Sequence, residues 1–475
     1  MSKKSLAAGN VARVATSRMA SLASGIATGF LIPKILGVED YGFFKIYTLY
    51  IVYTALLHFG FIDGILLKFA GERYDALDRA RFRTYTRFFT VFQLLVGMAL
   101  SLTSLFIGNP EYRFIVLMLG INMVLVNLTA YYQFISQATE RFKEYSARNF
   151  ILSILKLLLV IGLVIAHFAF EREISYRLYV ITLNAIDFSL LIWYVITYRD
   201  ITFGKALAFS KLKKEIFGLF KIGITLTVAY QISHFVLALD RQLVSMIFPT
   251  ETYAQYSFAY NIVTLISTLT SSLSLVLFPM LKRVTAEKAP QYYRRLLEPV
   301  VLILAASLMC YYPFCLFVEW FLPEYAESLV YLKVVLPILT FSSSISVVMF
   351  TFCKVLNRNM GFFFNGCITL AITLLLSGGA YFVWRSPLAI SAGTLLAIVI
   401  WFVIEAQHLK RIMGVGAWSE LLYLVLLALG FIANTFLVEN LYLSFAIHAV
   451  FFLTLTFVFY RKKLGALLAL VRNRK

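Results

Sequence analysis

The chain has 475 residues, of which 61% are hydrophobic, and its mean hydropathy is +0.82. This composition excludes an ordinary soluble domain, in which apolar residues make up about half of the chain. The formal net charge of +19 is the kind of charge that nucleic-acid-binding proteins carry, but the position of the basic residues argues against nucleic acid as a partner.

Apolar segments recur along the whole chain. A segment of about 20 apolar residues crosses about 30 Å of hydrocarbon as a helix, and we count about 14 such segments between residues 10 and 460. The sequence therefore predicts an all-α polytopic membrane protein with about 14 transmembrane helices.

The connecting loops differ in charge. When the loops are assigned alternately to two sides, about 34 of the 43 Lys and Arg residues fall on one side and about seven on the other. The positive-inside rule places the basic side, with both termini, in the cytoplasm. The excess charge is thus mainly a topology signal, and attraction to anionic lipid headgroups is a second effect.

The first span, 10–32, has a stripe of small polar residues with Arg13 at its edge. Small residues permit close helix packing, and a polar stripe also suits the wall of a cavity; the sequence leaves both open. The basic loop 68–87 is either a solvated cytoplasmic loop or a docking surface for partner enzymes.

The spans 150–170 and 178–198 each carry one charge, Lys156 and Asp187. Charges within the membrane are costly and are usually paired or functional. Lys156 either pairs with Asp187, or extends to the headgroups, or provides a cation in a cavity for an anionic ligand.

A weak internal repeat divides the chain. The turn at 36–42 has a counterpart at 249–255, and a lysine-rich linker near 205–214 separates two groups of six spans. Six is an even number, so two six-helix halves insert with the same orientation. We expect an N-terminal six-helix bundle at 1–210, a C-terminal six-helix bundle at 211–412, and two accessory helices with a basic tail at 413–475.

The segments 217–247 and 254–281 form a predicted hairpin with a polar stripe on each helix. Such stripes are costly against lipid, so we expect them to line a water-filled cavity within the bundle. The spacing matches one face of a helix for Thr227, Tyr230, His234 and Arg241, and again for Tyr260, Thr264, Ser267, Ser271 and Ser274. Asp240 points about 100° away from Arg241, which suits a structural or ion-coupling role.

Enzyme and cofactor signatures are absent from the sequence. It contains no Walker A lysine loop, no HExxH and no GxGxxG after a strand, and its four cysteines have no CxxC spacing. We therefore expect no cofactor and no metal site. The short outer loops argue against a membrane glycosyltransferase or polymerase, so a transporter is the better hypothesis than an enzyme.

Several motifs resemble those of Wzx-type polysaccharide flippases, in the superfamily of multidrug, oligosaccharidyl-lipid and polysaccharide exporters. They lie at the first outer turn, after the fourth span, and in the seventh and eighth spans. They are Ile32–Gly37 with Tyr41-Gly42, Gln137 with Glu140–Lys143 and Tyr145, and Asp240-Arg241 with Tyr256-Ser257, Ala259-Tyr260 and Phe278-Pro279. One position departs from the family pattern, because Gln255 stands where glycine is frequent.

This resemblance implies a function. Such proteins use two six-helix bundles in alternating access to move polyprenyl-pyrophosphate-linked oligosaccharide units across the bacterial inner membrane, for O-antigen, capsule or exopolysaccharide assembly. The implied partners are an undecaprenyl-pyrophosphate-linked oligosaccharide, membrane lipids and other polysaccharide-assembly proteins. A multidrug or cation antiporter of the same superfamily is the first alternative, and an integral-membrane glycosyltransferase or polymerase is an alternative of another class.

The predicted site follows from charge and residue chemistry. Cations suit a pyrophosphate or acidic sugar, whereas aromatic rings and hydroxyls suit a glycan. We expect the substrate cavity to use Arg241, Lys156, Arg13, His234, Tyr230 and Tyr260. Asp187 and Asp240 either couple transport to an ion or simply neutralise the two deep cations.

Overall fold

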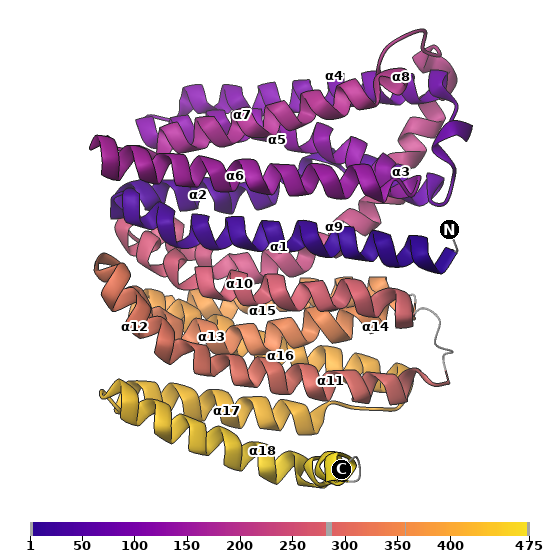
Figure 1. The fold of residues 1–475 in the computed structure, drawn as a ribbon. Coiled ribbons are helices and arrows are strands. Elements are labelled where there is room, and N and C mark those ends of the chain that lie inside the picture. The colour runs from indigo at the N-terminus through magenta and orange to yellow at the C-terminus, as the bar shows by residue number, and fades with distance from the viewer. Residues whose placement is uncertain (1–2, 282–286, 357, 473–475) are drawn as a thin grey trace. The chain divides into compact units, whose positions relative to one another are not determined.

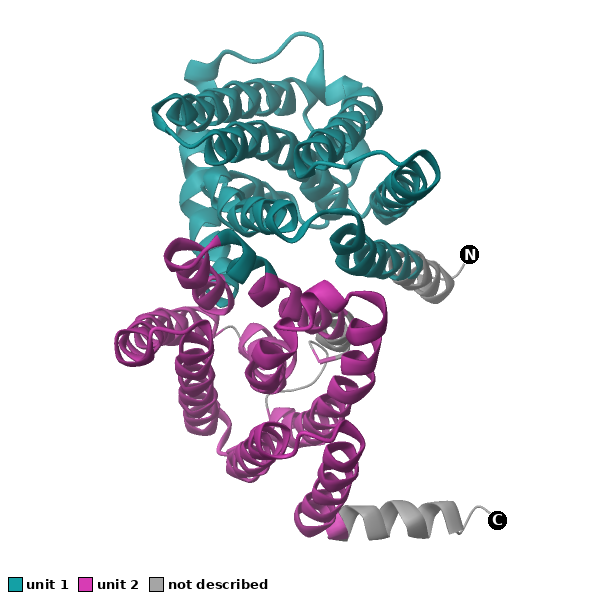
Figure 2. Cartoon of the chain, turned by 90° about the vertical axis from the view of Figure 1, so that its left-hand side faces the viewer, with its two compact units in different colours: residues 1–234, 250–254 teal, residues 235–249, 255–475 magenta. Residues whose placement is uncertain are grey.

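The computed structural model describes the backbone of residues 3–281, 287–356 and 358–472, and the side chains of residues 16–268, 281, 287–356 and 358–461. All regular structure in these residues is helical (Figure 1). The chain divides into two compact units, residues 1–234 with 250–254 and residues 235–249 with 255–475 (Figure 2). The predicted bundle boundaries at residues 210 and 412 stay predictions.

The first unit consists of long helices with two short ones and the beginning of α9 (Figure 1). Its helices are α1 (Lys3–Ile35), α2 (Val38–Thr54), α3 (Phe61–Phe69), α4 (Arg79–Thr103), α5 (Pro110–Ala138), α6 (Phe142–Phe170), α7 (Tyr176–Thr197) and α8 (Arg199–Thr202). α9 (Phe209–Ile247) has 39 residues and leaves this unit after His234.

The second unit contains the end of α9 and most of α10 (Thr250–Leu281). It continues with α11 (Ala289–Ala306), α12 (Tyr311–Phe321), α13 (Ser328–Ser344), α14 (Phe350–Val355), α15 (Asn359–Trp384), α16 (Pro387–Met413), α17 (Trp418–Leu437) and α18 (Leu441–Arg472). A π-helical turn at Ile345–Met349 joins α13 to α14.

The helices account for the predicted spans. Within the described residues, 11 helical segments are long and apolar enough to cross a membrane, and a bent pair at Val38–His58 and Phe61–Phe69 makes a twelfth. α1 with 33 residues and α10 with 32 residues add two more of sufficient length. The predicted fold, an all-α membrane protein with about 14 transmembrane helices, is confirmed.

The outer faces of the helices are apolar. On α4, for example, Leu95, Met98 and Leu102 are between 51% and 61% exposed. Exposure of such a face to water would be unfavourable, but in a bilayer the lipid chains cover it. The interior of the first unit is aromatic instead: Phe61 of α3 is fully buried, with its ring 4.9 Å from that of Phe89 and 6.4 Å from that of Tyr131.

The segment that connects α7 to α9 is tied to the start of α4. Tyr74 Oη donates to Asp200 Oδ1 at 2.7 Å, Arg79 Nε donates to Asp200 Oδ2 at 2.9 Å, and Arg83 Nε donates to the carbonyl of Asp200 at 2.8 Å. Burial alone raises the pKa of the Asp200 carboxyl, but the hydrogen bonds from Tyr74 and Arg79 and the charge of Arg79 outweigh burial and hold the pKa below its ordinary value.

Candidate functional site

The first candidate site lies at a break in the second membrane span. α2 continues through the short helix η1 (Ala55–His58), and the chain then bends by 57° into α3. Phe59 and Gly60 make the turn with φ angles of +49° and +84°. Positive φ is natural for glycine and strained for other residues. A Cβ on Gly60 would also lie 2.2 Å from the backbone nitrogen of Ile224, so two separate constraints require glycine here.

α3 and α9 touch backbone to backbone beside this break. A Cβ on Gly223 of α9 would lie 1.8 Å from the carbonyl oxygen of Gly60 and 2.5 Å from the nitrogen of Gly64. A Cβ on Gly64 would lie 2.2 Å from the carbonyl oxygen of Leu219. Small residues permit this close approach of helices inside a membrane. The three glycines therefore fix the position of α3 on α9.

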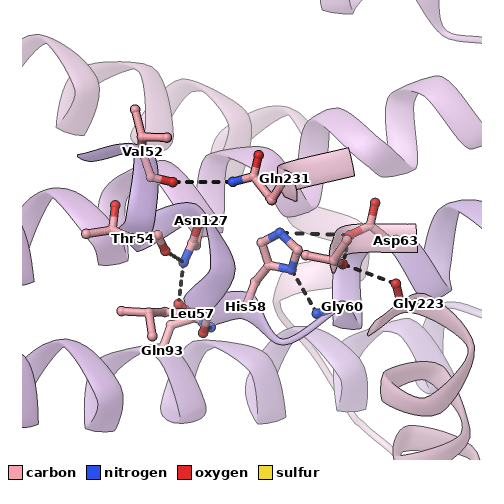
Figure 3. Close-up of polar contacts among 11 residues, drawn as sticks. Val52, Thr54, Leu57, His58, Gly60, Asp63, Gln93, Asn127, Gly223 and Gln231 are labelled. Atoms are coloured by element: carbon pink, nitrogen blue, oxygen red, sulfur yellow. Dashed lines mark hydrogen bonds and ion pairs between the residues drawn. The ribbon is translucent and has the colours of Figure 1, made fainter. Parts of the chain in front are cut away.

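Three side-chain amides cover backbone carbonyls at the end of α2 and η1 (Figure 3). They come from α4, α5 and α9, all within the first unit. Gln93 Nε2 donates to Leu57 O at 3.1 Å, Asn127 Nδ2 to Thr54 O at 3.5 Å, and Gln231 Nε2 to Val52 O at 3.3 Å. Added donors to carbonyls in an apolar interior are favourable, so these amides stabilise the break.

A buried histidine and a buried aspartate flank the turn (Figure 3). His58 Nδ1 accepts a hydrogen bond from the backbone N–H of Gly60 at 3.1 Å. His58 Nε2 lies 3.8 Å from Asp63 Oδ2, which is within ion-pair range and beyond hydrogen-bond range. The Thr227 hydroxyl lies 2.5 Å from Asp63 Oδ2 and 3.1 Å from the carbonyl oxygen of Gly223. We call these residues, His58, Gly60, Asp63, Gly223 and Thr227, the helix-break cluster.

Neither His58 nor Asp63 is among the site residues expected from the sequence. Both lie within a segment that reads as one continuous apolar span. The signal that identifies them is an acidic residue deep in a span, next to Gly60 and Gly64, because an acid at that depth is costly and glycines permit a break.

Lys156 and Asp187 form an ion pair, which is one of the three alternatives that the sequence left open for Lys156. Lys156 Nζ on α6 lies 3.0 Å from Asp187 Oδ1 on α7, and both side chains are partly exposed. The two charges neutralise each other in this conformation. Whether Lys156 also contacts an anionic ligand stays a prediction, as does ion coupling by Asp187.

Asp240 lies in a tyrosine-lined cluster of the second unit. Its side chain is fully buried; Oδ2 accepts hydrogen bonds from the hydroxyl of Tyr256 at 2.7 Å and from the hydroxyl of Tyr260. Oδ1 accepts from the backbone N–H of Arg241 at 2.7 Å, and the hydroxyl of Ser391 on α16 donates to that of Tyr256 at 2.9 Å. The aspartate therefore holds α9, α10 and α16 together within this unit.

Arg241 points differently from its neighbour. Its guanidinium carbon lies 4.7 Å from the ring centroid of Tyr260, and Nη2 donates to the carbonyl of Leu237 at 3.2 Å. Among the described residues its Nε has no hydrogen-bond partner. Arg241 is thus a partly buried cation that is stacked on an aromatic ring and retains donor capacity.

The remaining predicted residues are dispersed. Tyr230 is 56% exposed, and its ring lies 5.5 Å from that of His234, which is also exposed. Thr227 shares their stripe on α9 but is buried against Asp63, so the stripe meets two environments. The side chain of Arg13 lies outside the described residues. The substrate roles of these residues stay predictions.

The fold is shared with solved structures of a flippase and of transporters. The structure of "Lipid II flippase MurJ" in an inward closed conformation matches with a TM-score of 0.69 and 12% identity, over 96% of this chain and 99% of that chain. An inward-facing multidrug resistance MATE family transporter of the MOP superfamily matches with a TM-score of 0.59 and 13% identity, over 83% and 95%. The MATE transporter VcmN of Vibrio cholerae matches with a TM-score of 0.53 and 13% identity, over 85% and 98%.

The family follows from the sequence of the N-terminal part. Residues 9–285 match the model of the family described as "Polysaccharide biosynthesis protein", and the chain belongs to this family. No curated protein matches the chain. The chain is thus a multi-pass membrane protein of the polysaccharide biosynthesis family, built on a transporter fold.

Proposed function

We propose that the protein is a Wzx-type flippase, which moves polyprenyl-pyrophosphate-linked oligosaccharide units from the cytoplasmic to the outer leaflet of the bacterial inner membrane. Its two bundles, with the accessory helices beside the second, alternate access to the two leaflets. The product enters O-antigen, capsule or exopolysaccharide assembly.

The family match carries this proposal. A polysaccharide biosynthesis protein with a transporter fold, rather than an enzyme fold, is suited to translocating a glycan intermediate. MurJ, whose structure this fold matches over 96% of the chain, is a flippase for lipid II. The motifs at residues 32–42 and 240–260 agree with this assignment.

Cationic residues suit the pyrophosphate end of such a substrate, and aromatic rings suit its sugars. Arg241, stacked on Tyr260, offers guanidinium donors that match a pyrophosphate. Lys156 is already paired with Asp187, so it attracts an anion only after that pair opens. Tyr230 and His234 present exposed rings of the kind that pack against sugars.

Deletion of the gene in its host tests the proposal. We expect polyprenyl-linked oligosaccharide to accumulate, and to be protected in intact spheroplasts from a membrane-impermeant glycan-oxidising reagent. Plasmid-borne wild-type protein restores export, Arg241→Ala restores much less at matched protein level, and Lys211→Ala, which removes an exposed cation, restores fully. Accumulated glycan that is already accessible from outside would refute flippase function.

The likeness to MATE transporters supports a second candidate function, that of a multidrug or cation antiporter. This function predicts that deletion lowers resistance to lipophilic cations and leaves surface polysaccharide intact. The same deletion strain therefore separates the two functions.

The charge distribution of the loops supports an inner-membrane topology with both termini in the cytoplasm. Single cysteines introduced near the two ends of the chain should react with an impermeant maleimide in inside-out vesicles and remain unlabelled in spheroplasts. Labelling of either end in spheroplasts would show that this end faces the outside and would contradict the proposed topology.

A further inference from the structure

We propose that Asp63 is a proton-binding site whose occupancy controls the bend between α2 and α3. Asp63 belongs to the helix-break cluster, which lies within the first unit. Its use in transport rests on the proposed function, but proton binding at the break does not.

The hydrogen bond from Gly60 defines the state of His58. The Nδ1 atom that accepts from the Gly60 N–H at 3.1 Å carries no proton. The imidazole is therefore neutral, with its proton on Nε2. An imidazolium needs protons on both nitrogens, and its formation would break the bond that closes the turn.

The distance from His58 to Asp63 is too long for a charge-assisted hydrogen bond. Charge-assisted N–H···O bonds measure about 2.7–2.9 Å, whereas Nε2 and Oδ2 are 3.8 Å apart. A carboxylate without a close cation at this depth is expensive. A neutral, protonated Asp63 avoids that cost.

The hydrogen bonds of Thr227 also favour a protonated Asp63. Its single hydroxyl proton faces two acceptors, Asp63 Oδ2 at 2.5 Å and Gly223 O at 3.1 Å. An ionised Asp63 competes with the carbonyl for that proton. A protonated Asp63 donates to Thr227, and Thr227 donates to Gly223, so both contacts are satisfied at once.

The other side chains that hydrogen-bond at the break are amides and a hydroxyl, which do not titrate near neutral pH. α4 and α5 contribute the amides of Gln93 and Asn127, and α9 contributes that of Gln231 (Figure 3). α9 also contributes the hydroxyl of Thr227. The nearest charges along α3 and α9 are Lys68, Glu215 and Lys221; Lys68 pairs with Glu215, and the side chain of Lys221 is exposed. Among the described residues, His58 is thus the titratable partner of Asp63.

Loss of the proton from Asp63 destabilises the closed break. The reaction is a simple dissociation, in which the Asp63 carboxyl releases H⁺ and leaves a buried carboxylate. That charge is stabilised by water entering the break, which loosens α3 from α9. The bent, clamped arrangement is therefore the protonated state.

Amide hydrogen exchange on the purified full chain tests this without any substrate. After correction for intrinsic exchange, we expect protection of the amides in residues 55–66 to fall with rising pH, by up to about tenfold per pH unit, because the closed break holds one proton more than the open break. Asp63→Asn mimics the neutral acid and should abolish the slope. Glu405→Gln removes another buried carboxyl in the second unit and should preserve it.

His58→Gln identifies which group holds the proton, and it also serves if Asp63→Asn fails to fold. The glutamine oxygen replaces the acceptor for Gly60, so the slope should persist. A slope lost in His58→Gln, retained in Asp63→Asn, or absent from the wild type overturns the inference. A normal slope in a protein that moves no glycan would refute the proposed function and leave the proton site standing.

Discussion

Replacement of Gly223 by alanine tests the direct contact between α3 and α9. The new Cβ would lie 1.8 Å from Gly60 O and 2.5 Å from Gly64 N. Both are backbone atoms, so no side-chain rotation relieves the overlap. Ordinary contact begins at 3.4 Å, so α3 must move by about 1.6 Å in a closely packed interior. Overpacking costs about 1–3 kcal/mol, and alanine regains up to about 1 kcal/mol of helix propensity.

We therefore expect Gly223→Ala to lower stability by about 1–2 kcal/mol, measured as a lower apparent melting temperature in detergent, with faster amide exchange in residues 55–66. Gly218→Ala is the matched control, because a Cβ at Gly218 of the same helix meets nothing within 4 Å. It should be neutral or slightly stabilising. Equal stability of the two variants would refute the close contact of α3 with α9.

Three further predictions concern other contacts. Lys156→Ala should destabilise the protein more in the presence of Asp187 than in an Asp187→Ala background, and a double-mutant cycle by thermal denaturation should give a coupling of about 1 kcal/mol; zero coupling would mean that the observed pair contributes nothing. Tyr260→Phe removes a donor to the buried Asp240 and should cost about 1–3 kcal/mol in the same assay, while an unchanged melting temperature would exclude that bond. Asp200→Asn should increase amide exchange across residues 74–83 at neutral pH. Since the pKa of Asp200 is lowered, its stabilisation is present above the unfolded value of about 3.9 and is lost as the pH falls through the folded value, so the two proteins should converge in acid.

The sequence was sufficient to predict the helical membrane fold. Long apolar segments have one stable solution in lipid, a helix that satisfies its own backbone, and the number of spans follows from their lengths. It also suggested the pairing of Lys156 with Asp187, because two opposite charges on neighbouring spans are cheaper together than apart.

The break after α2 was not predictable in the same way. A hydropathy pattern averages over about 19 residues, and the apolar residues around Gly60 hide a 57° bend. Helical periodicity also failed to separate Thr227 from Tyr230. The two share a stripe, but α3 covers only Thr227, and which neighbour covers a stripe depends on tertiary packing.

The amides that cover the end of α2 have a consequence for biosynthesis. The ribosome completes residue 58 long before it adds Gln93, Asn127 or Gln231. Until the last of these reaches the membrane, the carbonyls at Val52, Thr54 and Leu57 lack the side-chain donors that satisfy them in the finished protein. Lipid tolerates such a break poorly, so the segment should insert as a continuous helix. It would acquire its bend only when α9 arrives, which makes the break a late event in the assembly of the first unit.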